Sequence, residues 1–113
     1  MRDSRARLAD ILDAIGAIRR HAESGREAFD RDELIQVWIV HHLQIIGEAA
    51  ARLDPTLVAS STVPWTGIVG MGNILVHRYF GIDLDAVWRV VERDLGPLEA
   101  EVRRLLGQSS PQG

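Results

Sequence analysis

Apolar residues recur at three- and four-residue steps along most of this chain, and no stretch alternates polar and apolar residues as a strand does. The first such series is Leu8, Ile11, Leu12, Ile15 and Ile18. On an α-helix this spacing places the apolar side chains on one face, which another helix can cover. The chain has 113 residues, of which 46% are apolar, and is long enough for one buried core. We therefore expect an all-α protein.

Breaks in the periodic pattern divide the chain into four long helices and one short helical turn. The expected long helices cover residues 4–23, a stretch from Asp30 or Asp32 to Leu53, residues 64–81 and residues 83–106. The short turn covers residues 56–59. Because the connections between the long helices are brief, the expected architecture is an antiparallel up-and-down four-helix bundle.

Capping residues and a proline set several of these boundaries. Asp54 precedes a proline and is expected to cap the short turn, and Asp83 is expected to cap the last helix. Pro97 falls inside the last helix. Proline lacks a backbone donor and crowds the carbonyl four residues earlier, here that of Arg93, so we expect a kink at this point.

Length, charge and leader signals limit the functional classes. We expect one domain over residues 1–107 and a flexible tail over residues 108–113. No signal peptide or bilayer-spanning apolar run is evident, so a cytoplasmic location without membrane attachment is expected. The absence of cysteine excludes disulfides and thiolate metal sites. The net charge of −3 means that any contact with RNA must come from a local patch.

Polar chemistry gathers in residues 70–81, which read GMGNILVHRYFG. Asn73 and His77 are four residues apart and would share a face of a helix. Histidine is the side chain that changes charge near neutral pH, so His77 is the candidate acid or base. Arg78 and Tyr79 follow it directly.

Several stretches resemble the HEPN domain, in particular the HepT-like toxins that are paired with minimal nucleotidyltransferases. The matching stretches are IIGEAA at 45–50, PW at 64–65, GM at 70–71, YFGID at 79–83, VW at 87–88 and DLGPL at 94–98. The family signature is an Arg, a polar residue, a short spacer, a His, one residue and a Tyr. Asn73, His77 and Tyr79 match it, but Gly72 stands where the family has its Arg.

The resemblance implies an all-helical HEPN bundle that forms a homodimer with two motif helices at the interface. It implies a metal-independent endoribonuclease that needs no cofactor and cleaves tRNA or mRNA. It also implies a toxin that a nucleotidyltransferase antitoxin neutralises, in some members by adenylylating the motif tyrosine, here Tyr79.

Metal-independent RNA cleavage needs a base for the 2′-OH, an acid for the leaving oxygen and a cation beside the phosphorane. His77 suits the acid or base role, whereas Gly72 removes the expected cation. By analogy with the loss of one oxyanion donor, that removal lowers the rate by roughly a hundred- to a thousandfold. On one straight helix, positions 72 and 77 would lie about 140° apart. A cleft shared by two copies would therefore suit them better.

Each site residue has a structural alternative. Asn73 either orients His77 or phosphate, or is a solvated helix residue. Arg78 either replaces part of the missing cation or is solvated. Tyr79 is either the modification site or an ordinary amphipathic residue near a helix end.

The pair His41 and His42 is the remaining candidate. These residues either line the RNA cleft or are partly buried bundle histidines. Adjacent helix residues diverge by about 100°, which disfavours a metal site at this pair.

Two other functional classes remain open. Gly72 is either a natural change that weakens or abolishes cleavage, or a substitution that detoxifies the protein. If activity is lost, the chain is a catalytically inactive HEPN module that binds a nucleotidyltransferase or RNA. A plain structural dimerisation domain would do neither.

Overall fold

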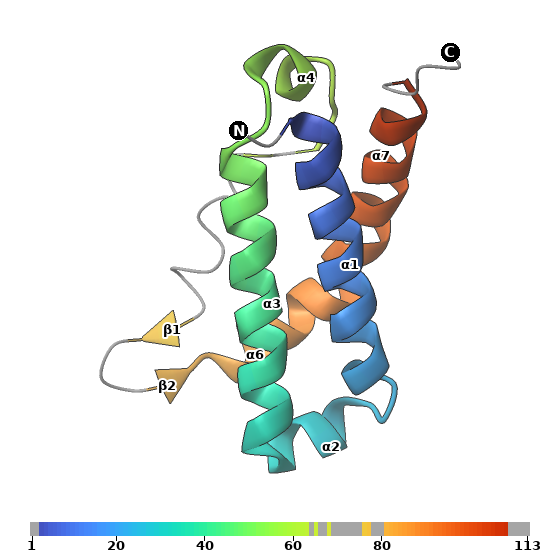
Figure 1. Cartoon of the computed structure of the whole chain (residues 1–113). Coiled ribbons are helices and arrows are strands. Elements are labelled where there is room, and N and C mark those ends of the chain that lie inside the picture. Colours follow the sequence, from blue (N-terminus) through green and yellow to red (C-terminus); the bar gives the residue numbers. More distant parts are fainter. Residues whose placement is uncertain (1–2, 64, 66–67, 69–75, 78–80, 109–113) are drawn as a thin grey trace.

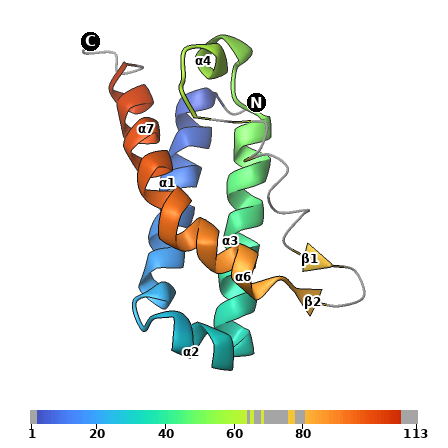
Figure 2. The same cartoon turned by 180° about the vertical axis from the view of Figure 1, so that it is seen from behind.

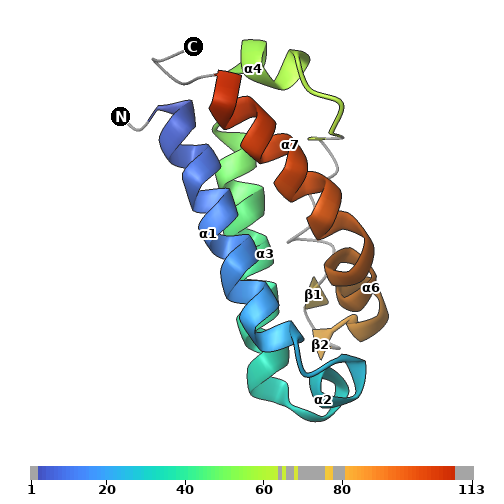
Figure 3. The ribbon, with the colours of Figure 1, turned by 90° about the vertical axis from the view of Figure 1, so that its right-hand side faces the viewer.

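The computed structural model describes residues 3–63, 65, 68, 76–77 and 81–108 (Figure 1). These residues confirm the all-α class that the sequence predicts. They form two layers, with α1 (Ser4–Ala22) and α3 (Glu33–Ala51) in one layer and the last helical segments in the other (Figure 3). None of the helices in the described part of the chain is both long and apolar enough to span a bilayer.

The two long helices α1 and α3 begin at aspartate caps. The carboxylate of Asp3 accepts a hydrogen bond from the Ala6 amide at 3.0 Å, and that of Asp32 accepts one from the Leu34 amide at 2.9 Å. Each bond satisfies an amide that has no partner within its helix. The second helix therefore begins after Asp32, the later of the two expected starts, and ends at Ala51.

A separate helix that the sequence analysis did not predict, α2 (Arg26–Arg31), connects α1 to α3. It follows Gly25, whose φ of +91° lies in the left-handed region that favours glycine. Phe29 is fully buried and stacks against the ring of Trp88, with 5.2 Å between ring centroids. Arg26 donates to Asp85 at 2.5 Å, so α2 is also tied to the last helical segment.

The short helix α4 (Pro55–Ala59) confirms the expected turn and its cap. Asp54 accepts from the Thr56 amide at 2.8 Å, and proline occupies the first turn of the helix. Farther along, Trp65 and Ile68 are helical, as the expected third helix requires.

The chain then departs from the expected helix. Val76 and His77 form strand β1 (Val76–His77), which pairs antiparallel with β2 (Gly81–Ile82). Figure 1 shows this pair beside α3, on the side away from α1. The expected helix over residues 64–81 is thus wrong at both strands, although the fold class stands.

The last expected helix is present but interrupted. It comprises α6 (Leu84–Arg89), a π-helical segment (Val90–Asp94) and α7 (Leu95–Gln108). The Leu95 amide donates to the Val90 carbonyl, five residues earlier, which is the π pattern. The irregularity therefore lies just before Pro97, where the sequence predicts a kink. Figure 2, the view from behind, shows α6 and α7 crossing in front of α1 and α3.

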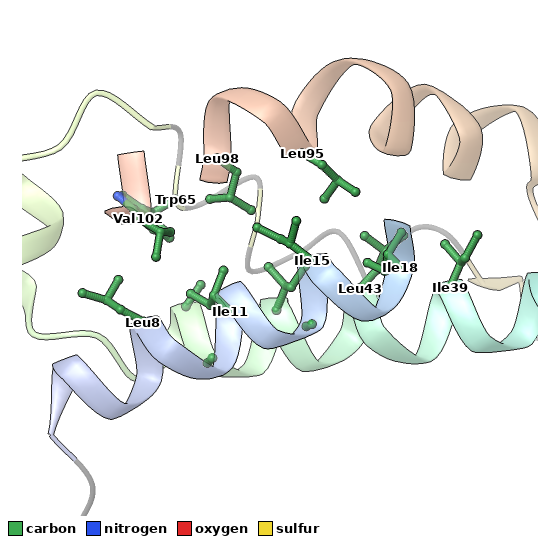
Figure 4. Packing of buried hydrophobic residues seen from close by; sticks show 14 of the residues in the cluster. Leu8, Ile11, Ile15, Ile18, Ile39, Leu43, Trp65, Leu95, Leu98 and Val102 are labelled. Atoms are coloured by element: carbon green, nitrogen blue, oxygen red, sulfur yellow. The ribbon is translucent and has the colours of Figure 1, made fainter. Parts of the chain in front are cut away.

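The core lies between these two layers (Figure 4). Its labelled members come from α1, α3 and α7, together with Trp65, which is 5% exposed. They are Leu8, Ile11, Ile15, Ile18, Ile39, Leu43, Trp65, Leu95, Leu98 and Val102. Trp65 therefore fixes the beginning of the motif-bearing stretch against the body of the protein.

Candidate functional site

His77, the candidate acid or base, lies in β1, where its backbone pairs with the first residue of β2. Gly72, Asn73, Arg78 and Tyr79 lie outside the described residues. The roles expected for these four residues, and for the His77 imidazole, stay predictions.

The extended backbone at His77 removes the expected helical face that Asn73 and His77 would share. A separation of four residues places Asn73 and His77 on one face only if both are helical. His77 is in a strand, so this relation does not hold, and neither does the angle of about 140° between positions 72 and 77. A shared cleft between two copies must therefore be supported by other observations.

The segment that carries His77 leads into a well-defined helix start. Gly81 has a φ of +82°, a conformation that L side chains rarely adopt. Two residues later, the Asp83 carboxylate accepts from the Ala86 amide at 3.0 Å and caps α6. Val87, in the first turns of α6, is fully buried. The core and the cap therefore fix the start of α6.

The stretch before the motif is held by a group of polar residues that we name the Glu101 cluster: Ser61, Thr62, Glu101 and Arg104. Glu101 is only 8% exposed. Its carboxylate accepts from Arg104 Nε and a terminal guanidinium nitrogen, both at 2.7 Å, and from the Ser61 hydroxyl at 2.6 Å. The Thr62 amide is a fourth donor, at 3.3 Å. All the oxygen acceptors of this buried carboxylate thus face donors.

These donors hold the pKa of Glu101 at about 2, below its usual value of 4.5. The largest cause is the hydrogen bonding from Arg104, followed by that from Ser61. A carboxylate with a lowered pKa in the folded state stabilises the fold above its unfolded-state pKa, and this contribution is lost as the pH falls. Glu101 is therefore ionised at neutral pH and is not a proton donor there.

We expect the variant Glu101→Gln to be less sensitive to acid. Between about pH 5 and pH 2 the natural chain should lose on the order of 2–3 kcal/mol that this variant does not lose, because only the carboxylate is protonated. Urea unfolding over a pH series measures the difference. Parallel pH profiles for the two proteins would contradict the assignment.

His41 and His42, the proposed RNA contacts, lie on α3 in different surroundings. His41 is exposed, whereas His42 is partly buried and stacks on Trp38 with 4.4 Å between ring centroids. His42 Nδ1 lies 2.8 Å from the Trp38 carbonyl oxygen, which can only accept, so Nδ1 carries a proton and Nε2 remains available. The ring of His21 from α1 also contacts Trp38, with 4.6 Å between ring centroids, and we name His21, Trp38 and His42 the imidazole cluster.

This imidazole cluster does not form a metal centre. Within the described ranges, no group of three or more His, Asp or Glu side chains could hold a metal ion. Trp38 Nε1 donates to the Ala17 carbonyl at 2.9 Å, so the cluster links α3 to α1. The structure therefore gives His42 the partly buried position that was its structural alternative and leaves His41 accessible.

Two large apolar side chains are exposed on the same helix. Leu34 is 81% exposed and Val37 is 52% exposed. With His41 they recur at steps of three and four residues, so the three share one face of α3. This face is the apolar surface most open to a partner among the described residues.

Glu101, Ser61 and Arg104 were not predicted from the sequence as functional residues. One signal was present: Glu101 falls between Leu98 and Leu105 in the apolar stripe of α7, where a charge must be paired to be buried. The sequence does not show that Ser61 is its partner, because Ser61 is forty residues away in the chain.

The model of the family "Ribonuclease HepT-like" matches residues 11–105. A protein of Methanocaldococcus jannaschii named "Putative RNase MJ1380" is 33% identical over 103 residues, covering 89% of this chain and 94% of its own. "Probable ribonuclease HepT" of Thermococcus cleftensis is 31% identical over 100 residues, covering 87% of this chain and 91% of its own.

A third relative is "Putative RNase TTE0752" of Caldanaerobacter subterraneus subsp. tengcongensis, which is 35% identical over 81 residues, 71% of this chain and 72% of its own. No solved structure matches this chain at a significant level. The matched range includes the part of α1 from Ile11 onward, all of α3, both strands and most of α7. The chain belongs to the HepT-like ribonuclease family of the HEPN superfamily.

Proposed function

We propose that this protein is the toxin of a toxin–antitoxin pair and a metal-independent endoribonuclease that acts on tRNA or mRNA as a homodimer. The observation that carries the proposal is the family match over residues 11–105, a range that includes His77, the residue that resembles the motif histidine in sequence. The pairing of the His77 backbone with Gly81 supports it, because catalysis needs an imidazole held at a fixed place.

In this proposal His77 moves the proton of the 2′-OH or of the leaving oxygen, and Asn73 orients His77 or the phosphate. Gly72 supplies no cation, so the rate is low compared with a protein that has the family Arg. Arg78, His41 and His42 contact the RNA. No cofactor takes part. The accessible imidazole of His41 supports that contact, since a ring N–H can donate to phosphate.

Regulation in this proposal comes from the antitoxin. A minimal nucleotidyltransferase adenylylates Tyr79, and the added phosphate and nucleoside repel and obstruct RNA. Neither step requires a membrane.

Incubation of RNA with the purified chain in excess chelator tests the proposal. We expect slow cleavage that falls by at least about tenfold in His77→Ala, the loss of an acid or base group. The variant His21→Ala is the matched control, because it removes an imidazole to which the proposal gives no role. Equal cleavage by all three proteins would contradict it.

The homodimer has its own support in the exposed face of α3. Covering Leu34 and Val37 on both copies removes four large apolar side chains from water, each worth roughly 1.5–3 kcal/mol when fully buried. We therefore expect the double variant Leu34→Glu/Val37→Glu to weaken dimerisation by at least about a hundredfold.

Sedimentation equilibrium measures this effect. Glutamate near the start of a helix is favourable to its dipole, so α3 should stay folded. The variant Ala100→Glu, on the exposed surface of α7, is the control for added charge. A double variant that dimerises as the natural chain does would place the interface elsewhere.

One observation favours a second function. Gly72 lacks the charge that the proposed chemistry needs, which fits a catalytically inactive module that only binds RNA or a nucleotidyltransferase. In that case RNA would bind to the chain without being cut. The fraction of RNA that stays intact in excess chelator would then be the same with the natural chain and with His77→Ala.

A further inference from the structure

The last helix places one buried charge beneath the loop that leads to His77. Glu101 is fixed on α7 between core residues, and Val102 next to it is fully buried. A carboxylate in this position is costly unless several donors meet it. The donors it meets come from its own helix and from the loop of residues 60–63, and from no other described element.

The Glu101 cluster constrains consecutive backbone groups of that loop. Arg104 donates to the Ser60 carbonyl at 3.3 Å while it pairs with Glu101. The Thr62 amide points to the carboxylate. The Ser61 hydroxyl donates to Glu101 and accepts from the Val63 amide at 3.2 Å. Linked hydrogen bonds of this kind strengthen one another away from water.

The constraint continues into the core. The Trp65 amide donates to the Val63 carbonyl at 2.8 Å, and the Trp65 side chain is buried among core residues. The direction in which the chain leaves Val63 therefore depends on the bonds that Glu101 receives. His77 lies twelve residues beyond Trp65, and no other buried charge occurs among the described residues.

We propose that Glu101 is a positioning residue for His77: its carboxylate, clamped by Arg104, fixes residues 60–63 and thereby the place from which the motif segment starts. This inference rests on the proposed function, because it gives Glu101 a part in that site. Glu101 does not touch the RNA, since its carboxylate is buried and already accepts hydrogen bonds from Arg104, Ser61 and Thr62.

The test compares Glu101→Gln with Glu99→Gln by nuclear magnetic resonance of the full chain. Glutamine keeps the size of the side chain but turns one acceptor into a donor. Because Arg104 donates to both oxygens of Glu101, one of its N–H groups then faces the glutamine NH2 group, whichever way the amide is turned. Glu99 is the matched control. It is on the same helix and pairs with Arg19 and Arg103, so the charge change is the same, but it has no bond to residues 60–63.

Two readouts decide the outcome. In Glu101→Gln the amides of Thr62 and Val63 should exchange with solvent at least about tenfold faster, while α1 and α3 amides keep their rates. The His77 imidazole signals should also move. Neither change should occur in Glu99→Gln. Ser61→Ala, a milder variant, should reproduce both effects and add little to Glu101→Gln.

Unchanged His77 signals in Glu101→Gln would overturn the inference, even if the loop amides exchange faster, because the cluster would then hold only the loop. Unchanged exchange at Thr62 and Val63 would overturn it as well. Both readouts are independent of RNA cleavage. A chain that cuts no RNA would therefore refute the proposed function while these measurements still decided the role of Glu101.

Discussion

Replacing Gly72 by arginine should raise the rate of RNA cleavage by roughly a hundred- to a thousandfold. The expected gain in rate equals the loss that follows when an enzyme loses one preorganised hydrogen-bond donor to a transition-state oxyanion. A guanidinium can give two parallel hydrogen bonds to phosphate oxygens and carries a charge at every relevant pH. Cleavage of a labelled RNA under single-turnover conditions measures the gain, and induction of the variant should inhibit bacterial growth.

The variant Gly107→Arg is the control for this experiment. Gly107 is exposed near the end of α7, and a side chain added there meets no atom within 4 Å. It adds the same charge at a site with no proposed role, so cleavage should not change. If the folded Gly72→Arg variant is no faster than Gly107→Arg and is harmless to cells, position 72 does not hold the missing cation.

Truncation of Phe29 should destabilise the fold by about 3–5 kcal/mol, which lowers Tm by roughly 10–25 °C. The Phe29 side chain is fully buried between α2 and the last helical segments and stacks on Trp88. Removing it leaves a cavity that short α2 cannot fill, since Arg26 and Asp85 fix its position from outside. Thermal and urea unfolding of Phe29→Ala measure the loss.

The variant Arg31→Ala is the control: it shows how much an alanine substitution in α2 destabilises the protein when no buried side chain is removed. Arg31 is exposed on the same short helix and pairs with Glu27 one turn earlier. Exposed pairs of this kind contribute about 0–1 kcal/mol. A similar small loss in both variants would mean that Phe29 does not anchor α2 to the core.

The sequence predicts the long elements well because their signals are local. The apolar stripes of α1 and α3 repeat over several turns, and Asp54 and Asp83 each precede the helix that they cap. The helix α2 was missed for the converse reason. It spans six residues with one buried side chain, Phe29, which is too short for a periodic pattern.

The candidate site was predictable only in its residue types. The apolar residues before His77 fit a helical stripe or a strand equally well, and Gly81 fits a helix end as well as a turn. The strand pairing of His77 with Gly81 decides between them and depends on three-dimensional contacts. The same holds for Glu101, since its partner Ser61 is brought to it by the packing of α7.

RNA cleavage in excess chelator by Gly72→Arg and by the double variant Gly72→Arg/His77→Ala tests the role of His77 directly. If His77 moves the proton in a metal-independent reaction, Gly72→Arg should cleave RNA in chelator, and the double variant should be as slow as His77→Ala alone. A double variant that retains the activity of Gly72→Arg would contradict the central role of His77.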